Sequence, residues 1–334
     1  MTAKEQAHRL TYLDGWRGLA ILFVLLGHFG PFGAMWGSFG VELFFVLSGR
    51  LMAHILYIER MGLRKFFWRR FSRIYPVLLV FVLAMLIVTF AAQAMGREEG
   101  TNALTAFSAL TFWINLYGAF GGNIAGPLDH LWSIAIEEHS YAILAAMSVA
   151  VARNRKIAVW LCICLSILAM INGAVLYYKG AGYVHEIYWR TDVRIAPVFL
   201  SAGLYLLTRE IRNPHWALPP VFLLCAATTF HSFGSLPLKM TVPTLMLAYA
   251  VNTIEYSHEF VRRFLSLPVF VWAGLISYSL YIWQQPFYKV ANGSSWALFP
   301  AVILAMASYF LVETPARRWL NRRRIGDLPM DPIP

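Results

Sequence analysis

The stretch LDGWRGLAILFVLLGHFG, residues 13–30, indicates the kind of fold. Its apolar part approaches the roughly 20 residues that an α-helix needs to cross the hydrocarbon core of a bilayer. Arg17 and His28 interrupt it eleven residues apart. On a helix, eleven steps of 100° return to within about 20° of the starting direction, with a rise of about 16 Å. Both side chains should therefore face one interior space at different depths, where ionisable groups are candidate functional residues.

The whole chain repeats this apolar character. Of its 334 residues, 59% are hydrophobic and 13% are charged, whereas a soluble domain averages about 25% charged residues. This composition excludes an ordinary soluble or disordered protein. We expect an all-α polytopic membrane protein of about ten transmembrane helices. The expected spans are 13–32, 38–58, 74–95, 131–152, 157–178, 192–208, 216–232, 236–254, 268–288 and 298–315.

One apolar stretch, residues 104–116, is too short to cross and is expected to be re-entrant or interfacial. With ten crossings, most of the 28 Lys and Arg residues fall in loops on a single side, as the positive-inside rule requires. Both termini are then cytoplasmic, and the chain divides into a single membrane domain, 1–316, and a short basic cytoplasmic tail, 317–334. The net charge of +11 is explained by topology, so nucleic acid is not an expected partner; the bilayer is.

The second expected span, GVELFFVLSGRLMAHIL (residues 40–56), carries buried polar residues. Glu42 requires a cationic or hydrogen-bonding partner at the non-cytoplasmic end. Ser48 and Gly49 have two open interpretations. They either permit close helix packing, or Ser48 makes a polar contact.

The stretch RKFFWRRFSRIYP (residues 64–76) is expected to be a basic loop that ends at the Pro opening the third span. It is either a topology signal with lipid-phosphate contacts or a site for the phosphates of a cytosolic cofactor, because Arg binds phosphate bidentately. Arg70 and Arg73, with Arg69 beside them, are the candidates. Three-residue spacing puts Arg70 and Arg73 on one face of any helix they form.

Two later stretches add candidates. In GPLDHLWSIAIEEHSY (residues 126–141), Glu137 lies five residues beyond Trp132 and should sit inside the membrane, where a carboxylate beside a His can orient it. No spacing is specific for a metal site. Further on, Asp192 and Arg194 either pair with each other at a helix start or contribute to an acceptor site.

Six stretches, in order, resemble the acyltransferase 3 family of integral membrane acyltransferases. They are LDGWRGLAILFVLLGH (13–28), GVELFFVLSG (40–49), RRFSRIYP (69–76), LWSIAIEEHSY (131–141), ISYSLYIWQQP (276–286) and LVETPARRW (311–319). The chain departs from the family pattern at Glu42, where Asp is common, at Arg50, and at Gln284-Gln285, where many members have a His before the Pro.

The resemblance implies transfer of an acyl group, usually acetyl, from acyl-CoA to an acceptor hydroxyl, without a tightly bound cofactor. It makes Arg17 and His28 the essential pair, assigns Arg70 and Arg73 to the CoA side, and matches Glu137 to the family's acidic residue. We expect His28 to act as general base or to carry the acyl group transiently, with Glu137 orienting it. Glu42, Ser48, Trp132 and Arg194 are candidate substrate contacts.

The implied acceptor contains carbohydrate, such as an exopolysaccharide, a lipopolysaccharide sugar or a glycolipid, and the implied location is a bacterial inner membrane. The competing class is a transporter of an acyl group or small substrate that uses the buried His, Glu and Arg residues. No obvious inverted repeat supports that alternative. The sequence does not indicate an oligomeric state.

Overall fold

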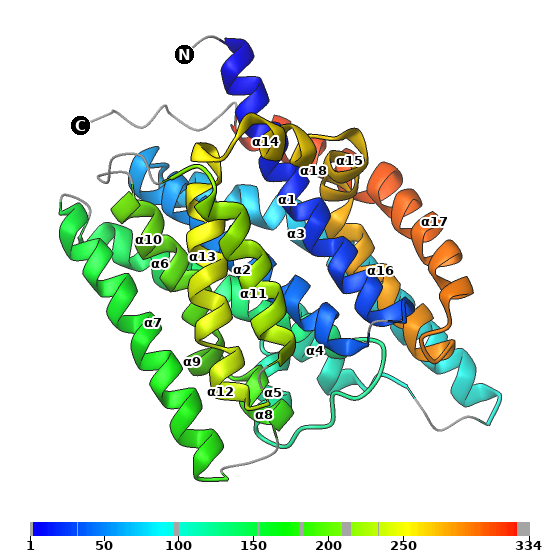
Figure 1. Cartoon of the computed structure of the whole chain (residues 1–334). Coiled ribbons are helices and arrows are strands. Elements are labelled where there is room, and N and C mark those ends of the chain that lie inside the picture. Colours follow the sequence, from blue (N-terminus) through cyan, green and yellow to red (C-terminus); the bar gives the residue numbers. More distant parts are fainter. Residues whose placement is uncertain are drawn as a thin grey trace.

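A computed structural model of the chain describes residues 3–325 except 32, 97–99, 152–153, 181–183, 209–214 and 233. The described residues are mostly helical and contain no strand. Four helices are long and apolar enough to cross a membrane by length and composition. These features confirm an all-α, multi-pass membrane protein (Figure 1).

Each of the ten expected spans coincides with a helical segment. The segments are α1 (Ala3–Phe29), α2 (Ala34–Ala53) with η1 (His54–Ile58), α3 (Leu63–Ala94), α6 (Trp132–Ala150), α7 (Arg155–Tyr178), α10 (Ala196–Thr208), α11 (Leu218–Ser232), α13 (Val242–Thr253), α15 (Pro268–Leu275) with α16 (Ser277–Val290), and α17 (Leu298–Ser308) with η5 (Tyr309–Glu313).

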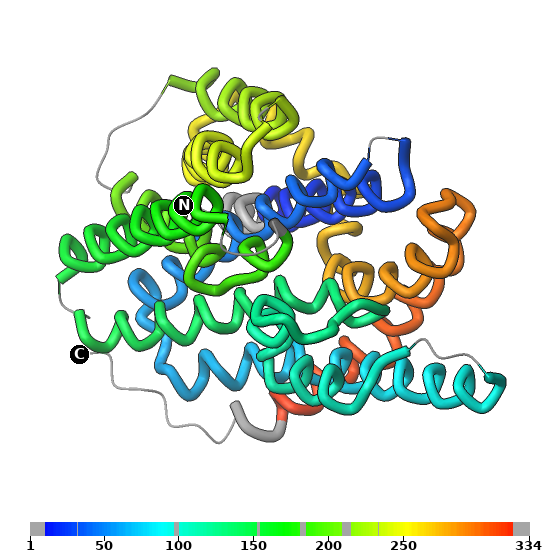
Figure 2. Tube along the Cα trace, turned by 90° about the horizontal axis from the view of Figure 1, so that it is seen from below, coloured from blue at the N-terminus to red at the C-terminus, as the bar shows by residue number. Residues whose placement is uncertain are grey.

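Helix α2 lies at the centre of the bundle. Of the four long apolar helices it is the most enclosed, with 61% of its apolar window buried against 22–39% for the others. It packs on α1, α6, α10, α11 and α13. Gly49 permits the contact with α10, because a Cβ at this position would lie 2.1 Å from the carbonyl oxygen of Val198. Figure 2 shows α11 and α13 on one side of this centre and the 63–150 segment on the opposite side.

The short helices gather at the two ends of the bundle. Helices α4 (Ala103–Leu110), α5 (Ile114–Ala119), α8 (Val184–Trp189), α9 (Thr191–Arg194) and α12 (Leu236–Lys239), with η2 (Asp129–Leu131), lie toward one end (Figure 1). Helices α14 (Glu259–Leu265) and α18 (Thr314–Ile325) lie at the other end, beside the start of α1. The stretch 104–116 thus forms two short helices that pack on α3 and α6. The remaining short elements are η3 (Ile254–Tyr256) and η4 (Ser295–Ala297).

The basic stretch 64–76 is helical, contrary to the loop that we expected. Helix α3 starts at Leu63 and runs through Pro76 without a break. Pro76 cannot donate to the carbonyl of Ser72, four residues earlier. Close by, Tyr278 of α16 donates to the carbonyl of Ile74 at 2.7 Å and ties this part of α3 to α16. The first turns of α3 are covered by α18, where Ser72 bonds Asn321 at 3.1 Å. Helix α18 passes through residue 317, where the tail was expected to begin, and residues 326–334 lie outside the described part.

Candidate active site

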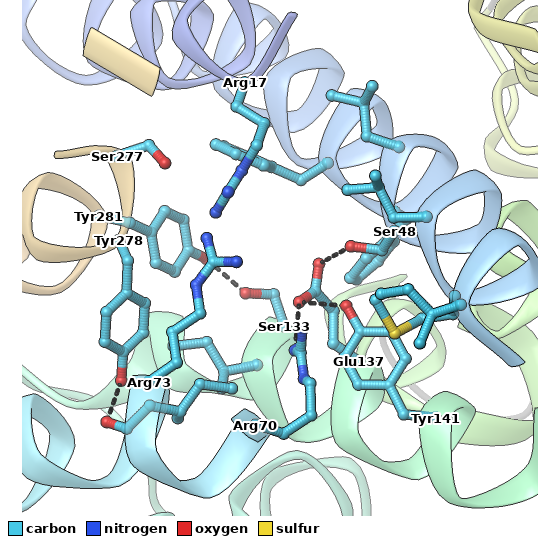
Figure 3. Close-up of a pocket in the computed structure, with 18 of the residues that line it drawn as sticks. Arg17, Ser48, Arg70, Arg73, Ser133, Glu137, Tyr141, Ser277, Tyr278 and Tyr281 are labelled. Carbon is cyan, nitrogen blue, oxygen red and sulfur yellow. Dashed lines mark hydrogen bonds and ion pairs between the residues drawn. The ribbon is translucent and has the colours of Figure 1, made fainter. Parts of the chain in front are cut away.

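A cavity of about 360 Å³ lies between α1, α2, α3, α6 and α16, in the half of the bundle nearer α18. Helices α1, α2 and α6 correspond to the first, second and fourth expected spans, and α3 and α16 complete the lining. Its wall contains six of the residues singled out from the sequence (Figure 3): Arg17, Ser48, Arg69, Arg70, Arg73 and Glu137.

Two arginines point into this cavity from different helices. Figure 3 shows the guanidinium groups of Arg17 from α1 and Arg73 from α3 approaching each other across the space. Neither makes a hydrogen bond or an ion pair within 4.0 Å with any other residue in the described part of the chain. Asp14 also lines the cavity and interacts electrostatically with Arg73. Two guanidinium groups that face each other inside a membrane protein require an anionic ligand or water to compensate their charge.

Arg70, one turn before Arg73, has protein partners instead. Its guanidinium lies 3.0 Å from the Glu138 carboxylate and 4.0 Å from that of Glu137. It also lies over the ring of Tyr141, 4.0 Å from the centroid. Arg70 and Arg73, which were expected to bind the donor phosphates together, therefore have different surroundings. Arg73 faces the cavity, and Arg70 neutralises two carboxylates of α6.

Ser48 makes the polar contact that was one of its two interpretations. Its hydroxyl donates to Oε1 of Glu137 at 2.8 Å, while Tyr141 donates to Oε2 at 2.9 Å. The close helix approach is made by Gly49 alone. Glu137 thus has both oxygens occupied by donors at the wall of the cavity.

His28 lies at the other end of α1, outside the cavity wall. Its Nδ1 is 2.7 Å from Oε1 of Gln284, and its ring stacks on Tyr288 with centroids 4.4 Å apart. The expectation that Glu137 orients His28 is therefore wrong, because each has other partners. The sequence indicated that both residues are buried, but not that they lie at different depths.

The cavity and His28 are linked through α16. Tyr281 lines the cavity and bonds the Ser133 hydroxyl at 2.6 Å, whereas Gln284, three residues further along the helix, contacts His28. Three residues correspond to a rise of about 4.5 Å. His28 is thus held one helical turn beyond the cavity wall.

Glu42 has the cationic partner that its position required. Arg194, on α9, forms an ion pair with it at 2.7 Å, and both side chains are almost completely buried. Thr244 also donates to Glu42. The alternative pairing of Arg194 with Asp192 is wrong, because Asp192 pairs with Arg190 at 2.7 Å.

Trp132 belongs to the same layer behind the cavity. Its ring contacts Phe45 and Tyr188 edge-on, at centroid distances of 6.1 and 5.0 Å. Phe45 lines the cavity, and Arg194 lies over both Phe45 and Tyr188. Trp132, Glu42 and Arg194 therefore support the cavity wall and do not line it.

The sequence did not single out Gln284 as a functional residue, although it noted the Gln pair. The signal was present, since two neighbouring amides interrupt an apolar stretch. Neutral amides attract less attention than ionisable groups, yet in a membrane interior they also require partners. Asp129, which contacts Gln285, lies in the stretch 126–141, where the sequence singled out Glu137 and Trp132.

Comparison with known proteins identifies the class of the molecule. The family model described as an acyltransferase domain matches residues 10–322. The chain therefore belongs to this acyltransferase family, which confirms the resemblance found in the sequence. No solved structure matches the chain.

Similar proteins carry related names. The chain is 26% identical to "Peptidoglycan O-acetyltransferase OatA" of Listeria monocytogenes, over 92% of this chain and 55% of that protein. It is 27% identical to "Putative membrane-bound transacylase BcsY" of Komagataeibacter xylinus, over 94% of this chain and 84% of that protein. The chain thus spans little more than half the length of the peptidoglycan O-acetyltransferase that it matches.

Proposed function

We propose that this protein is a membrane O-acyltransferase that moves an acyl group, acetyl foremost, from acyl-CoA to a hydroxyl of a carbohydrate-containing acceptor. Membership of the acyltransferase family supports the reaction class. The names of two relatives, a peptidoglycan O-acetyltransferase and a membrane-bound transacylase, support the acetyl group and an envelope polysaccharide as acceptor.

The observation that carries the donor assignment is the convergence of Arg17 and Arg73 on one cavity (Figure 3). CoA carries phosphate groups, and a guanidinium binds phosphate oxygens with charge-assisted bonds. The cavity is also lined by apolar side chains such as Phe44 and Ile134, which suit the less polar arm of the donor. The phosphates bind at the arginines, and the thioester points toward Tyr281.

The same proposal fixes the orientation in the membrane. With the ten crossings and cytoplasmic termini that we propose, the arginine end of the cavity faces the cytosol, where acyl-CoA is made. His28 then lies toward the extracytoplasmic side and acts as general base on the acceptor hydroxyl. The location that follows is the bacterial inner membrane.

Arg73→Ala is expected to weaken donor use specifically. Losing a hydrogen bond to a charged group costs about 1.5–3 kcal/mol, so the Michaelis constant for acetyl-CoA should rise roughly 10- to 100-fold. The constant for the acceptor should stay the same. The measurement is steady-state transfer of labelled acetyl by the protein in lipid nanodiscs, varying donor and acceptor separately.

The matched control is Arg263→Ala, which removes an arginine from an exposed ion pair with Glu259 on α14. Exposed pairs contribute little, so both constants should stay at wild-type values. An unchanged donor constant in Arg73→Ala would reject the donor site. In sealed proteoliposomes, labelled acetyl that enters the lumen without becoming bound to any acceptor would favour a transporter.

A further inference from the structure

A chain of hydrogen bonds runs from His28 to the bundle end that carries α5 and η2. Gln284 Nε2 lies 3.2 Å from Gln285 Oε1, and Gln285 Nε2 lies 2.6 Å from Oδ1 of Asp129. The other oxygen of Asp129 pairs with Lys289 at 2.7 Å. Gln284 and Gln285 are buried, whereas His28 and Asp129 are half-buried. The chain of hydrogen bonds thus begins and ends at partly accessible side chains, His28 and Asp129.

Asp129, at the far end of this hydrogen-bond chain, determines which group donates and which accepts in every bond. A carboxylate paired with a Lys only accepts hydrogen bonds. Gln285 must therefore present its NH₂ to Asp129 and its oxygen to Gln284. Gln284 must then present its NH₂ to Gln285.

A second, longer contact agrees with this orientation of Gln284. Its Nε2 also lies 3.4 Å from the backbone carbonyl oxygen of Tyr281, which cannot donate. The Gln284 oxygen is therefore the atom that faces His28. Only an N–H satisfies that oxygen, so neutral His28 carries its proton on Nδ1.

We propose that Gln284 is a positioning residue that holds His28 in the Nδ1-protonated tautomer, with Asp129 as the anchor that sets the polarity of the chain. This inference rests on the proposed function. It leaves Nε2 unprotonated and able to take the proton of the acceptor hydroxyl as its oxygen attacks the acyl carbonyl, with the CoA thiolate as leaving group. The opposite tautomer has no lone pair at Nε2 and cannot accept that proton.

The environment of Nε2 agrees with this role. Gly37 of α2 lies beside that edge of the ring, and a Cβ added there would be 3.6 Å from Nε2. The Tyr288 ring covers one face of the imidazole. Asp129, Lys289 and the imidazole of His130 interact electrostatically with His28. A small residue at 37 thus keeps the edge of the base uncovered.

The direct test is ¹⁵N NMR of histidine-labelled protein in nanodiscs, with the His28 signals assigned by their absence from His28→Ala. We expect a protonated Nδ1 and an unprotonated Nε2 for the neutral ring. In Asp129→Asn the anchor can donate as well as accept, so both amides can reverse and the two tautomers should appear together. A wild-type His28 protonated on Nε2, or an Asp129→Asn spectrum identical to wild type, would overturn the proposal.

Kinetics supply a second test. Gln284→Leu should lower kcat at least about tenfold, as expected when a catalytic His loses its tautomer control, with the acetyl-CoA Michaelis constant unchanged. In a His28→Ala background the same substitution should add no further loss, because Gln284 acts only through His28. The matched control, Gln93→Leu at the exposed end of α3, should keep wild-type kcat.

An additive loss in the double variant would show a merely structural role for Gln284 and contradict the proposal. The two sets of results separate this inference from the proposed function. If His28→Ala keeps full activity while the NMR shows the expected tautomer, the general-base assignment fails and the positioning contact stands.

Discussion

His28→Ala is expected to lower kcat about 10²- to 10⁴-fold, the usual contribution of a positioned general base. The loss should fall on kcat, because His28 lies beyond the cavity wall and makes no described contact with Arg17 or Arg73. The acetyl-CoA Michaelis constant should therefore change little. Steady-state transfer in nanodiscs measures both quantities.

The matched control is His231→Ala, which removes an exposed His at the end of α11. It should keep wild-type kcat and equal membrane insertion. Full activity in His28→Ala would remove His28 from the mechanism, whereas a raised donor constant with normal kcat would place it in the donor site.

Arg194→Met should produce the largest loss of stability. It leaves the Glu42 carboxylate with Thr244 but without its cation, at a position that is fully buried. Removing one partner of a buried ion pair typically costs about 3–5 kcal/mol. The Arg194 side chain also packs on Phe45 and Tyr188, so its removal loosens the wall behind the cavity. Unfolding of the detergent-solubilised protein, followed by denaturant titration, measures the change.

The paired variant Glu42→Leu/Arg194→Met separates charge from packing. Replacing both partners with apolar residues removes the uncompensated carboxylate, so most of the lost stability should return. A double variant as unstable as Arg194→Met alone would mean that the packing of Arg194, and not its charge, stabilises the bundle.

Burial and periodicity explain what the sequence could predict. Long apolar stretches predicted helical segments, because a backbone in hydrocarbon must satisfy its own hydrogen bonds, and four of these segments are long and apolar enough to cross a membrane. The eleven-residue spacing placed Arg17 and His28 on one helix at different depths, and the structure has them in that order along α1. Glu42 was expected to have a cationic or hydrogen-bonding partner, and it has both, in Arg194 and Thr244.

The sequence could not predict which side chains pair across helices. Glu137 and Ser48 are 89 residues apart, and His28 and Gln284 are 256 apart. A single sequence indicates that such groups are buried, but not which side chains of other helices they meet. For that reason Glu137 was matched to His28 although it bonds Ser48 and Tyr141.

Local rules misplaced the start of α3. A Pro at position 76 commonly opens a helix, and the basic residues before it favoured a loop. In the structure those residues form the first turns of α3 and pack on α18. Tertiary contacts, which a local pattern does not contain, extend the helix by more than two turns.

Mass spectrometry of cell-envelope carbohydrates tests acyl transfer most directly. The comparison uses a deletion strain of the source organism complemented with wild type, with His28→Ala or with His231→Ala at equal expression. We predict an acetyl-sized increment on a carbohydrate hydroxyl with wild type and His231→Ala, and its loss with His28→Ala. The same increment in the uncomplemented deletion strain, or in none of the strains, would contradict the account.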